Sequence, residues 1–277
     1  MSQQPNSLEA WLAFFGQADI PVLRYTAREL ERMRADEAQL NARSVSDVVG
    51  DDPLMTVKLL HYMQTHKHRY QKYELVDVKQ TLLMLGLETF FREVPATPVA
   101  EDALSDYRAA LVQLLQTVRR AQRAAHYAYD WALRLHDLHA EEVLVSALLT
   151  YVAEMLMWCF NPQKMLEISR LQAADPALRS VEVQRQVLGF TLVDLQHRLA
   201  IEWKLPELLL SMTDPAQAKT SRVRNVRLAV NLARHSAQGW DNAALPDDYR
   251  EIGALLRMPP DKVMSLLKPS PADAPEA

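Results

Sequence analysis

Glycine, cysteine and net positive charge are all scarce in this chain. It has six glycines in 277 residues, and no convincing period-2 run is present, so strands are expected to be nearly absent. A single cysteine, Cys159, excludes an internal disulfide framework and fits a reducing compartment. The formal charge of -4 provides no broad attraction for phosphate backbones or anionic lipid. Neither nucleic acid nor a membrane surface is therefore the expected partner.

Targeting and membrane segments are also lacking. The start, Met1–Ser7, is polar and uncharged, unlike the basic start and apolar stretch of a signal peptide. The apolar run Leu144–Phe160 is shorter than the roughly 20 uninterrupted residues of a spanning helix, and it carries Glu154. We expect a cytoplasmic protein in which this run forms a core helix.

Helix-start signals are frequent and predict an all-α fold. Thr26 and Glu29 have the spacing of a capping box for a helix that reaches about Leu40. The dipeptide Asp52-Pro53 provides an N-cap residue followed by proline at the first helical position. These signals mark the starts of two helices in the first third of the chain.

Longer helical patterns follow in the second half. Residues 105–135 predict one long helix, Val143–Phe160 a helix that is apolar on several faces, and Val181–Trp203 a further stretch of helical spacing. The few polar positions of the apolar helix cluster at its middle, where chemistry would lie in a buried helix. They are Ser146, Thr150, Tyr151 and Glu154.

A proline-rich break at Pro95–Pro98 divides the chain. We predict a helical N-terminal lobe at about residues 18–95, a second lobe at about 103–240, closing helices at about 246–268, and a disordered tail at 269–277. No long linker separates the lobes, so we expect them to pack as one unit.

Five segments, taken in order, resemble the HDOD domain, an all-helical signalling module related to HD-type metal phosphohydrolases. They are Ile20–Leu23, Val48–Leu60 with Asp52-Pro53-Leu54, Val78–Gly86, Leu148–Met157, and Leu188-Gly189 with Trp203–Pro206. The resemblance covers about residues 18–265. It implies a multi-helix bundle in two packed lobes with an HD-like second lobe, and a regulatory role in bacterial signalling.

The resemblance also implies that the HD metal site has been lost. Thr150 and Tyr151 are found where HD enzymes have adjacent His and Asp, and Leu192 is found where a later histidine would come. A hydroxyl, a phenol and an aliphatic group cannot replace carboxylates and imidazoles around a divalent ion. We therefore expect no catalytic residue, metal or cofactor, and a module that binds an unidentified signalling protein; its oligomeric state is left open.

Two alternatives remain. A divergent metal-dependent phosphohydrolase could use His136, which precedes Asp137, together with His139 and Glu142, if these converge with a fourth ligand. A sensor of a nucleotide second messenger could use basic residues to contact phosphates, although a solvated loop and a charged helix face are the simpler interpretations of these residues. The candidate contacts are His66, Lys67, His68, Arg69 and Lys72 in one loop, and Arg119, Arg120 and Arg123 on the long helix.

Overall fold

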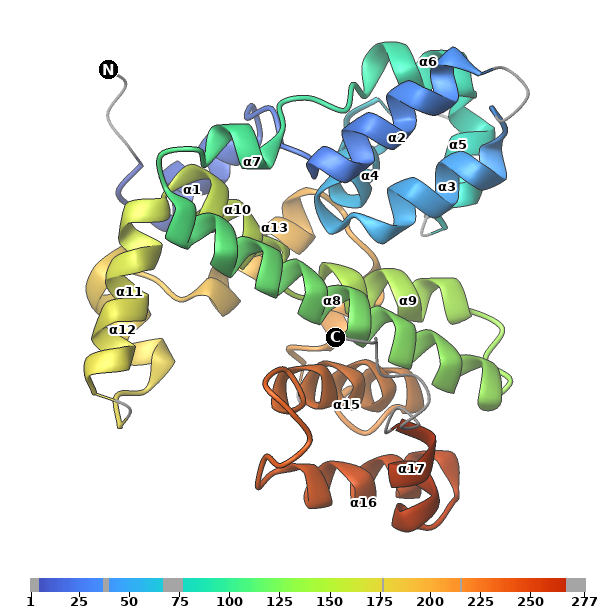
Figure 1. Cartoon of the computed structure of the whole chain (residues 1–277), viewed down its shortest axis with the longest axis vertical. Helices are drawn as coiled ribbons and strands as arrows, with labels where there is room; N and C mark the ends of the chain where they lie inside the picture. The colour runs from blue at the N-terminus through green and yellow to red at the C-terminus, as the bar shows by residue number, and fades with distance from the viewer. Residues whose placement is uncertain (1–4, 37–39, 67–76, 176, 215, 268–277) are drawn as a thin grey trace, which may run out of the picture.

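The computed structural model describes residues 5–36, 40–66, 77–175, 177–214 and 216–267 (Figure 1). Its helices are α1 (Leu8–Phe15), α2 (Arg24–Ala35), α3 (Ala42–Asp51), α4 (Pro53–Thr65), α5 (Val78–Leu85), α6 (Leu87–Glu93), α7 (Ala100–Ala103), α8 (Arg108–Arg134), α9 (Ala140–Leu149), α10 (Val152–Phe160), α11 (Pro162–Ala174), α12 (Ser180–Leu188), α13 (Leu192–Glu202), α14 (Glu207–Ser211), α15 (Ser221–His235), α16 (Leu245–Leu256) and α17 (Pro260–Leu267).

The predicted all-α, multi-helix fold is confirmed. Within the described ranges, β pairing consists of one isolated parallel bridge between Val22 and Val99. The predicted tail at 269–277 lies outside the described residues, and the lobe boundaries remain a prediction.

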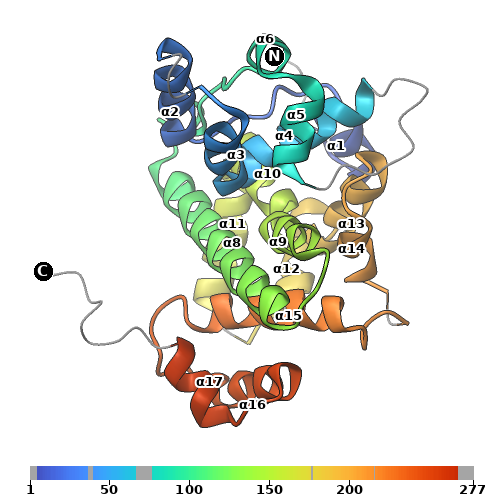
Figure 2. The same cartoon turned by 90° about the vertical axis from the view of Figure 1, so that its right-hand side faces the viewer.

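The long helix α8 forms the centre of the molecule and contacts α9, α10 and α15 along its length (Figure 2). Small side chains make this close approach possible, because several alanines lie on its buried face. These fully or almost fully buried alanines are Ala110, Ala121, Ala124, Ala125, Ala128 and Ala132. The buried side chain of Asn225 also donates to the carbonyl of Ala128 at 3.0 Å, which ties α15 to α8.

The start of α2 differs from its prediction. Thr26 is buried inside the helix and does not cap it, and the helix ends at Ala35, before Leu40. Carboxylates distant in sequence bind the free amides instead: Glu101 accepts from the backbone N–H of Arg24 at 2.9 Å. The capping-box prediction was wrong because a tertiary contact replaces the local one.

The start of α4 agrees with its prediction. Asp52 is buried, and its carboxylate accepts from the backbone N–H groups of Leu54 at 2.9 Å and Met55 at 3.2 Å. The same carboxylate accepts from the N–H of Leu23 at 2.9 Å. One side chain therefore caps α4 and also fixes the segment that enters α2.

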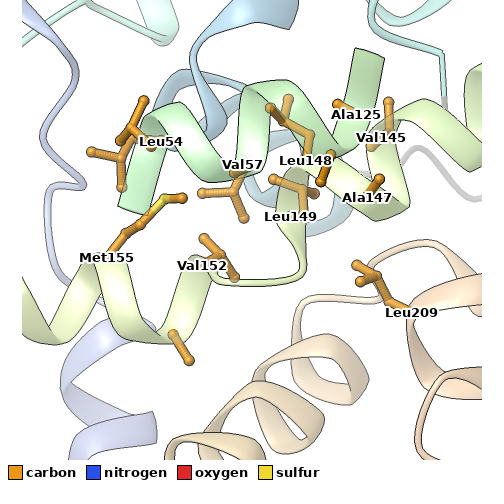
Figure 3. Packing of buried hydrophobic residues seen from close by; sticks show 14 of the residues in the cluster. Leu54, Val57, Ala125, Val145, Ala147, Leu148, Leu149, Val152, Met155 and Leu209 are labelled. Carbon is orange, nitrogen blue, oxygen red and sulfur yellow. The ribbon is translucent and has the colours of Figure 1, made fainter. Parts of the chain in front are cut away.

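The apolar run predicted as a core helix lies in the interior, but it is not one regular helix. It forms α9 and α10, with a turn at Thr150–Tyr151 between them. Figure 3 shows Leu149 and Val152, on the two sides of this turn, near Val57 of α4. In length and composition Ala140–Phe160 could span a membrane, but 72% of its most apolar window is buried inside the protein, as in a core helix.

The predicted stretch Val181–Trp203 is likewise divided, into α12 and α13. Gly189 ends α12 with φ 85°, a left-handed conformation that glycine adopts without strain. Thr191 and Asp194 then form a capping box that starts α13.

Candidate functional site

The turn between α9 and α10 is held open by a side chain from a third helix. In a continuous helix the N–H of Ala153 would donate to the carbonyl of Leu149. Here the N–H of Ala153 donates to Oε1 of Gln196 at 2.9 Å, and Nε2 of Gln196 donates to the carbonyl of Leu149 at 3.1 Å. The carboxamide of this α13 residue is thus inserted into the helical ladder, which is a known cause of a helix break.

The break places the two expected dyad positions at a turn. The hydroxyl of Thr150 donates to the carbonyl of Ser146 at 2.9 Å, so it satisfies a backbone group of its own helix. Tyr151 is half-buried, and burial raises the pKa of its phenol, so the group is neutral at ordinary pH. Neither side chain offers a charged ligand.

An arginine of α8 lies over this turn. The guanidinium carbon of Arg120 is 5.3 Å from the centre of the Tyr151 ring, in cation–π geometry. Its Nη2 donates to Oε1 of Glu154 at 3.2 Å and to the hydroxyl of Thr117 at 3.0 Å. Thr117 Oγ1 is itself 2.9 Å from the same carboxylate oxygen. We call Thr117, Arg120, Tyr151 and Glu154 the Arg120 cluster.

The cluster is partly shielded from water. The side chains of Arg120 and Glu154 are 25% and 23% exposed, respectively, and Trp158 lies 3.4 Å from the carboxylate oxygen through its Nε1. An arginine keeps its proton in proteins, so the cluster contains a permanent internal cation. The resemblance to HD enzymes gives a metal dyad at Thr150 and Tyr151, beside this cation.

These residues do not fit a metal ion. The carboxylate of Glu154 is occupied by Arg120, while Thr150 and Tyr151 present a hydroxyl and a neutral phenol. Within the described ranges, no group of three or more His, Cys, Asp and Glu residues could hold a metal ion. Divalent ions need several convergent deprotonated ligands, which this donor set does not supply.

The third expected position, Leu192, does not belong to the cluster. It is the first residue of α13, and its N–H donates to Oε1 of Gln184 at 2.9 Å. The α13 residue that reaches the turn is Gln196, one helical turn later. Sequence reasoning missed Gln196; the usable signal was its position on the same helix face as Leu192.

The alternative metal group at His136 does not converge. His136 and His139 are exposed, while Arg222 binds both carboxylates, with its Nε 2.9 Å from Asp137 and its Nη1 3.3 Å from Glu142. Burial on its own would raise the pKa of Asp137, but the hydrogen bonds from Arg222 and from the His139 amide hold it below its usual value. The acidic groups are therefore engaged by an arginine.

Three of the predicted anion contacts line one cleft. Arg119, Arg120 and Arg123 share with Asp51 a hollow of about 860 Å³ beside α8, which we call the α8 cleft. Its other polar lining residues include Gln113, Gln116, Gln122, His126, Tyr127 and Gln238.

The predicted basic loop is described only at its start. His66 is exposed and stacks on Tyr62, with ring centres 4.1 Å apart, and it does not line the α8 cleft. Lys67, His68, Arg69 and Lys72 lie outside the described residues. Among the predicted anion contacts, the structure thus brings together the helical arginines.

The comparisons with known proteins agree with this fold. A helical bundle of this kind is the fold of an HD-related protein. The chain belongs to the HDOD family: the family model named HDOD domain matches residues 20–218. No curated protein matches the sequence.

Two solved structures share the fold at low sequence identity. The response regulator MmoQ of Methylococcus capsulatus has a TM-score of 0.68 and 16% identity, over 92% of this chain and 100% of that one. A virulence factor of Campylobacter jejuni has a TM-score of 0.69 and 17% identity, over 96% of both chains. At these identities the likeness concerns the fold alone.

Proposed function

We propose that this chain is a non-catalytic module of bacterial signalling that acts by binding another protein. The observation that carries the proposal is the ion pair between Arg120 and Glu154 beside Tyr151. A guanidinium donates hydrogen bonds but cannot coordinate a metal, and it neutralises the carboxylate of the cluster. The Arg120 cluster therefore carries a positive charge but does not support metal-dependent hydrolysis.

Membership of the HDOD family supports a regulatory role. MmoQ, whose fold the chain shares, is described as a response regulator, which is a signalling protein. Both points fit a module that recognises a partner.

We place the partner-binding surface at a cleft of about 440 Å³ between α2 and the segment 90–99, called the α2 cleft. Its floor is apolar, with buried Leu30 and Phe90 and half-buried Phe91. Exposed Arg28 and Arg34 lie among its lining residues, with Arg34 5.8 Å from the centre of the Phe91 ring; Glu31 is the one carboxylate that lines it within the described ranges. This combination fits a partner segment with acidic and apolar side chains.

Affinity capture from the native host tests partner binding. The double variant Arg28→Glu/Arg34→Glu should lose a protein that the wild type captures, whereas Arg227→Glu, an exposed arginine of α15, should retain it. Equal capture by all three proteins would contradict the α2 cleft as the surface.

A substrate screen tests the non-catalytic part. The purified protein, supplied with divalent metals, should hydrolyse neither phosphodiesters nor nucleotides. Turnover that disappears in Glu154→Gln would overturn the proposal.

A further inference from the structure

The α8 cleft carries more positive charge than its surroundings neutralise. Arg120 pairs with Glu154, but Arg123 donates through Nη2 to the carbonyl of Ala233 at 3.0 Å, which leaves its charge without a carboxylate. Arg119 is exposed and has no hydrogen bond or ion pair to the described residues. Two uncompensated guanidinium groups therefore lie in one hollow.

One carboxylate lines the described part of the cleft, against three guanidinium groups. Asp51 lies at the end of α3, and its Oδ2 accepts from Gln122 at 3.3 Å. Burial raises the pKa of Asp51, which favours its neutral form more than in water. The cleft therefore has the electrostatic character of an anion site.

The spacing of the arginines costs stability unless an anion is present. Arg119 and Arg123 are four residues apart on α8, so they lie on the same face, where like charges repel. Nε atoms of Arg120 and Arg123 are also buried without an acceptor among the described residues. Unpaired buried donors are unfavourable, and an anion close by would relieve the charge repulsion around them.

The other lining residues suit more than a bare anion. Gln116 and Gln238 offer amide donors and acceptors, and Tyr127 offers a ring whose neighbour is Trp131, with ring centres 6.0 Å apart. Amides recognise the edges of bases, and aromatic rings support stacking. The volume of about 860 Å³ is within the range of sites for small organic ligands.

We propose that the α8 cleft binds a nucleotide through its phosphate groups. Arg119 and Arg123 are the principal phosphate contacts, because a guanidinium presents paired donors that match phosphate oxygens. Arg120 stays in its ion pair and forms part of the wall. A long nucleic acid is not the ligand, because the chain carries a net charge of -4 and the α8 cleft is a hollow of about 860 Å³.

Occupancy of this cleft would act on two parts of the molecule. Nε2 of Gln122 donates to the backbone carbonyl of Asp51 at 2.8 Å, which joins the end of α3 to α8. Both residues line the cleft, so a nucleotide bound there lies against the contact between them. This proposal does not depend on the protein-binding function proposed above.

Calorimetric titration of the full chain tests the inference. The probes are GTP, ATP and cyclic di-GMP, with inorganic phosphate as the bare anion. We expect saturable binding of at least one nucleotide, and at least tenfold weaker binding in Arg119→Ala and in Arg123→Ala. Arg119 is exposed, so its variant should fold normally.

The matched control is Arg108→Ala, an exposed arginine on the same helix that does not line the cleft. It should bind the nucleotide as the wild type does. The inference is overturned if no probe gives heat at millimolar concentration, if inorganic phosphate binds as tightly as every nucleotide, or if Arg108→Ala weakens binding as much as Arg119→Ala.

Discussion

The guanidinium of Arg120 lies 3.2 Å from the carboxylate of Glu154, across the interface between α8 and α10. Tyr151, which lies beneath the guanidinium, is one of the two positions, with Thr150, to which the family resemblance gives a metal dyad. The positive charge there is supplied by the chain itself.

Removal of Arg120 should destabilise the fold. Arg120→Ala leaves the partly buried carboxylate of Glu154 without its charged donor, and hydrogen bonds to charged groups contribute about 1.5–3 kcal/mol. We expect a loss of about 1–3 kcal/mol in the free energy of unfolding, measured in urea. A double-mutant cycle with Glu154→Gln should give a coupling energy of about 1 kcal/mol. A loss within experimental error of zero would show that the pair is incidental.

Gln196 should control the break between α9 and α10. In Gln196→Ala the N–H of Ala153 and the carbonyl of Leu149 lose their partner, which should cost about 1–3 kcal/mol in the free energy of unfolding. Hydrogen exchange at the Ala153 amide should become faster. Gln196→Glu, which keeps the acceptor and loses the donor, should have an intermediate effect. Unchanged exchange in both variants would mean that the break forms without this side chain.

Substitution of Asp52 should be among the more destabilising changes in the first part of the chain. Its buried carboxylate accepts from three backbone amides, so Asp52→Ala leaves several donors unsatisfied and should cost about 2–4 kcal/mol. Asp52→Asn keeps one acceptor oxygen and should cost less. Thermal unfolding of the two variants measures this order, and an equal or reversed order would refute it.

The pairing of Asp137 with Arg222 should make stability depend on acid pH. The pKa of Asp137 is lower in the folded protein than its ordinary value of about 3.9. Between the two pKa values the unfolded chain therefore binds more protons than the folded protein. The stability that Asp137 contributes is complete above about pH 4 and disappears as the pH falls through the lower pKa of the folded protein. Between about pH 5 and about pH 2, the denaturant midpoint of Asp137→Asn should fall less than that of the wild type. Parallel pH curves would contradict this assignment.

Local signals made some elements predictable from sequence. Asp52 caps the helix that directly follows it, so the capping residue and the amides that it binds are adjacent in the sequence. The start of α2 was not predictable in this way, because Glu101, 77 residues away from Arg24, binds its amide. The break at Thr150–Tyr151 depends on Gln196, which is 43 residues from Ala153.

Some residues of the site were predictable from the sequence, but their arrangement was not. The resemblance identified Thr150 and Tyr151. The spacing of basic residues on the long helix identified Arg120 as one of several candidate phosphate contacts. The sequence does not indicate that, of the three arginines that line the α8 cleft, Arg120 pairs with Glu154 while Arg119 and Arg123 do not. That division depends on how α8 packs against α10 and α15, which periodicity alone does not specify.

Metal content is the most direct test of the account. The wild-type protein, equilibrated with manganese, iron(II) or zinc and passed through a desalting column, should retain far less than one ion per chain by mass spectrometry. Retention of one or more ions per chain, abolished by Glu154→Gln and unaffected by Arg108→Ala, would contradict the claim that the Arg120 cluster does not bind a metal ion.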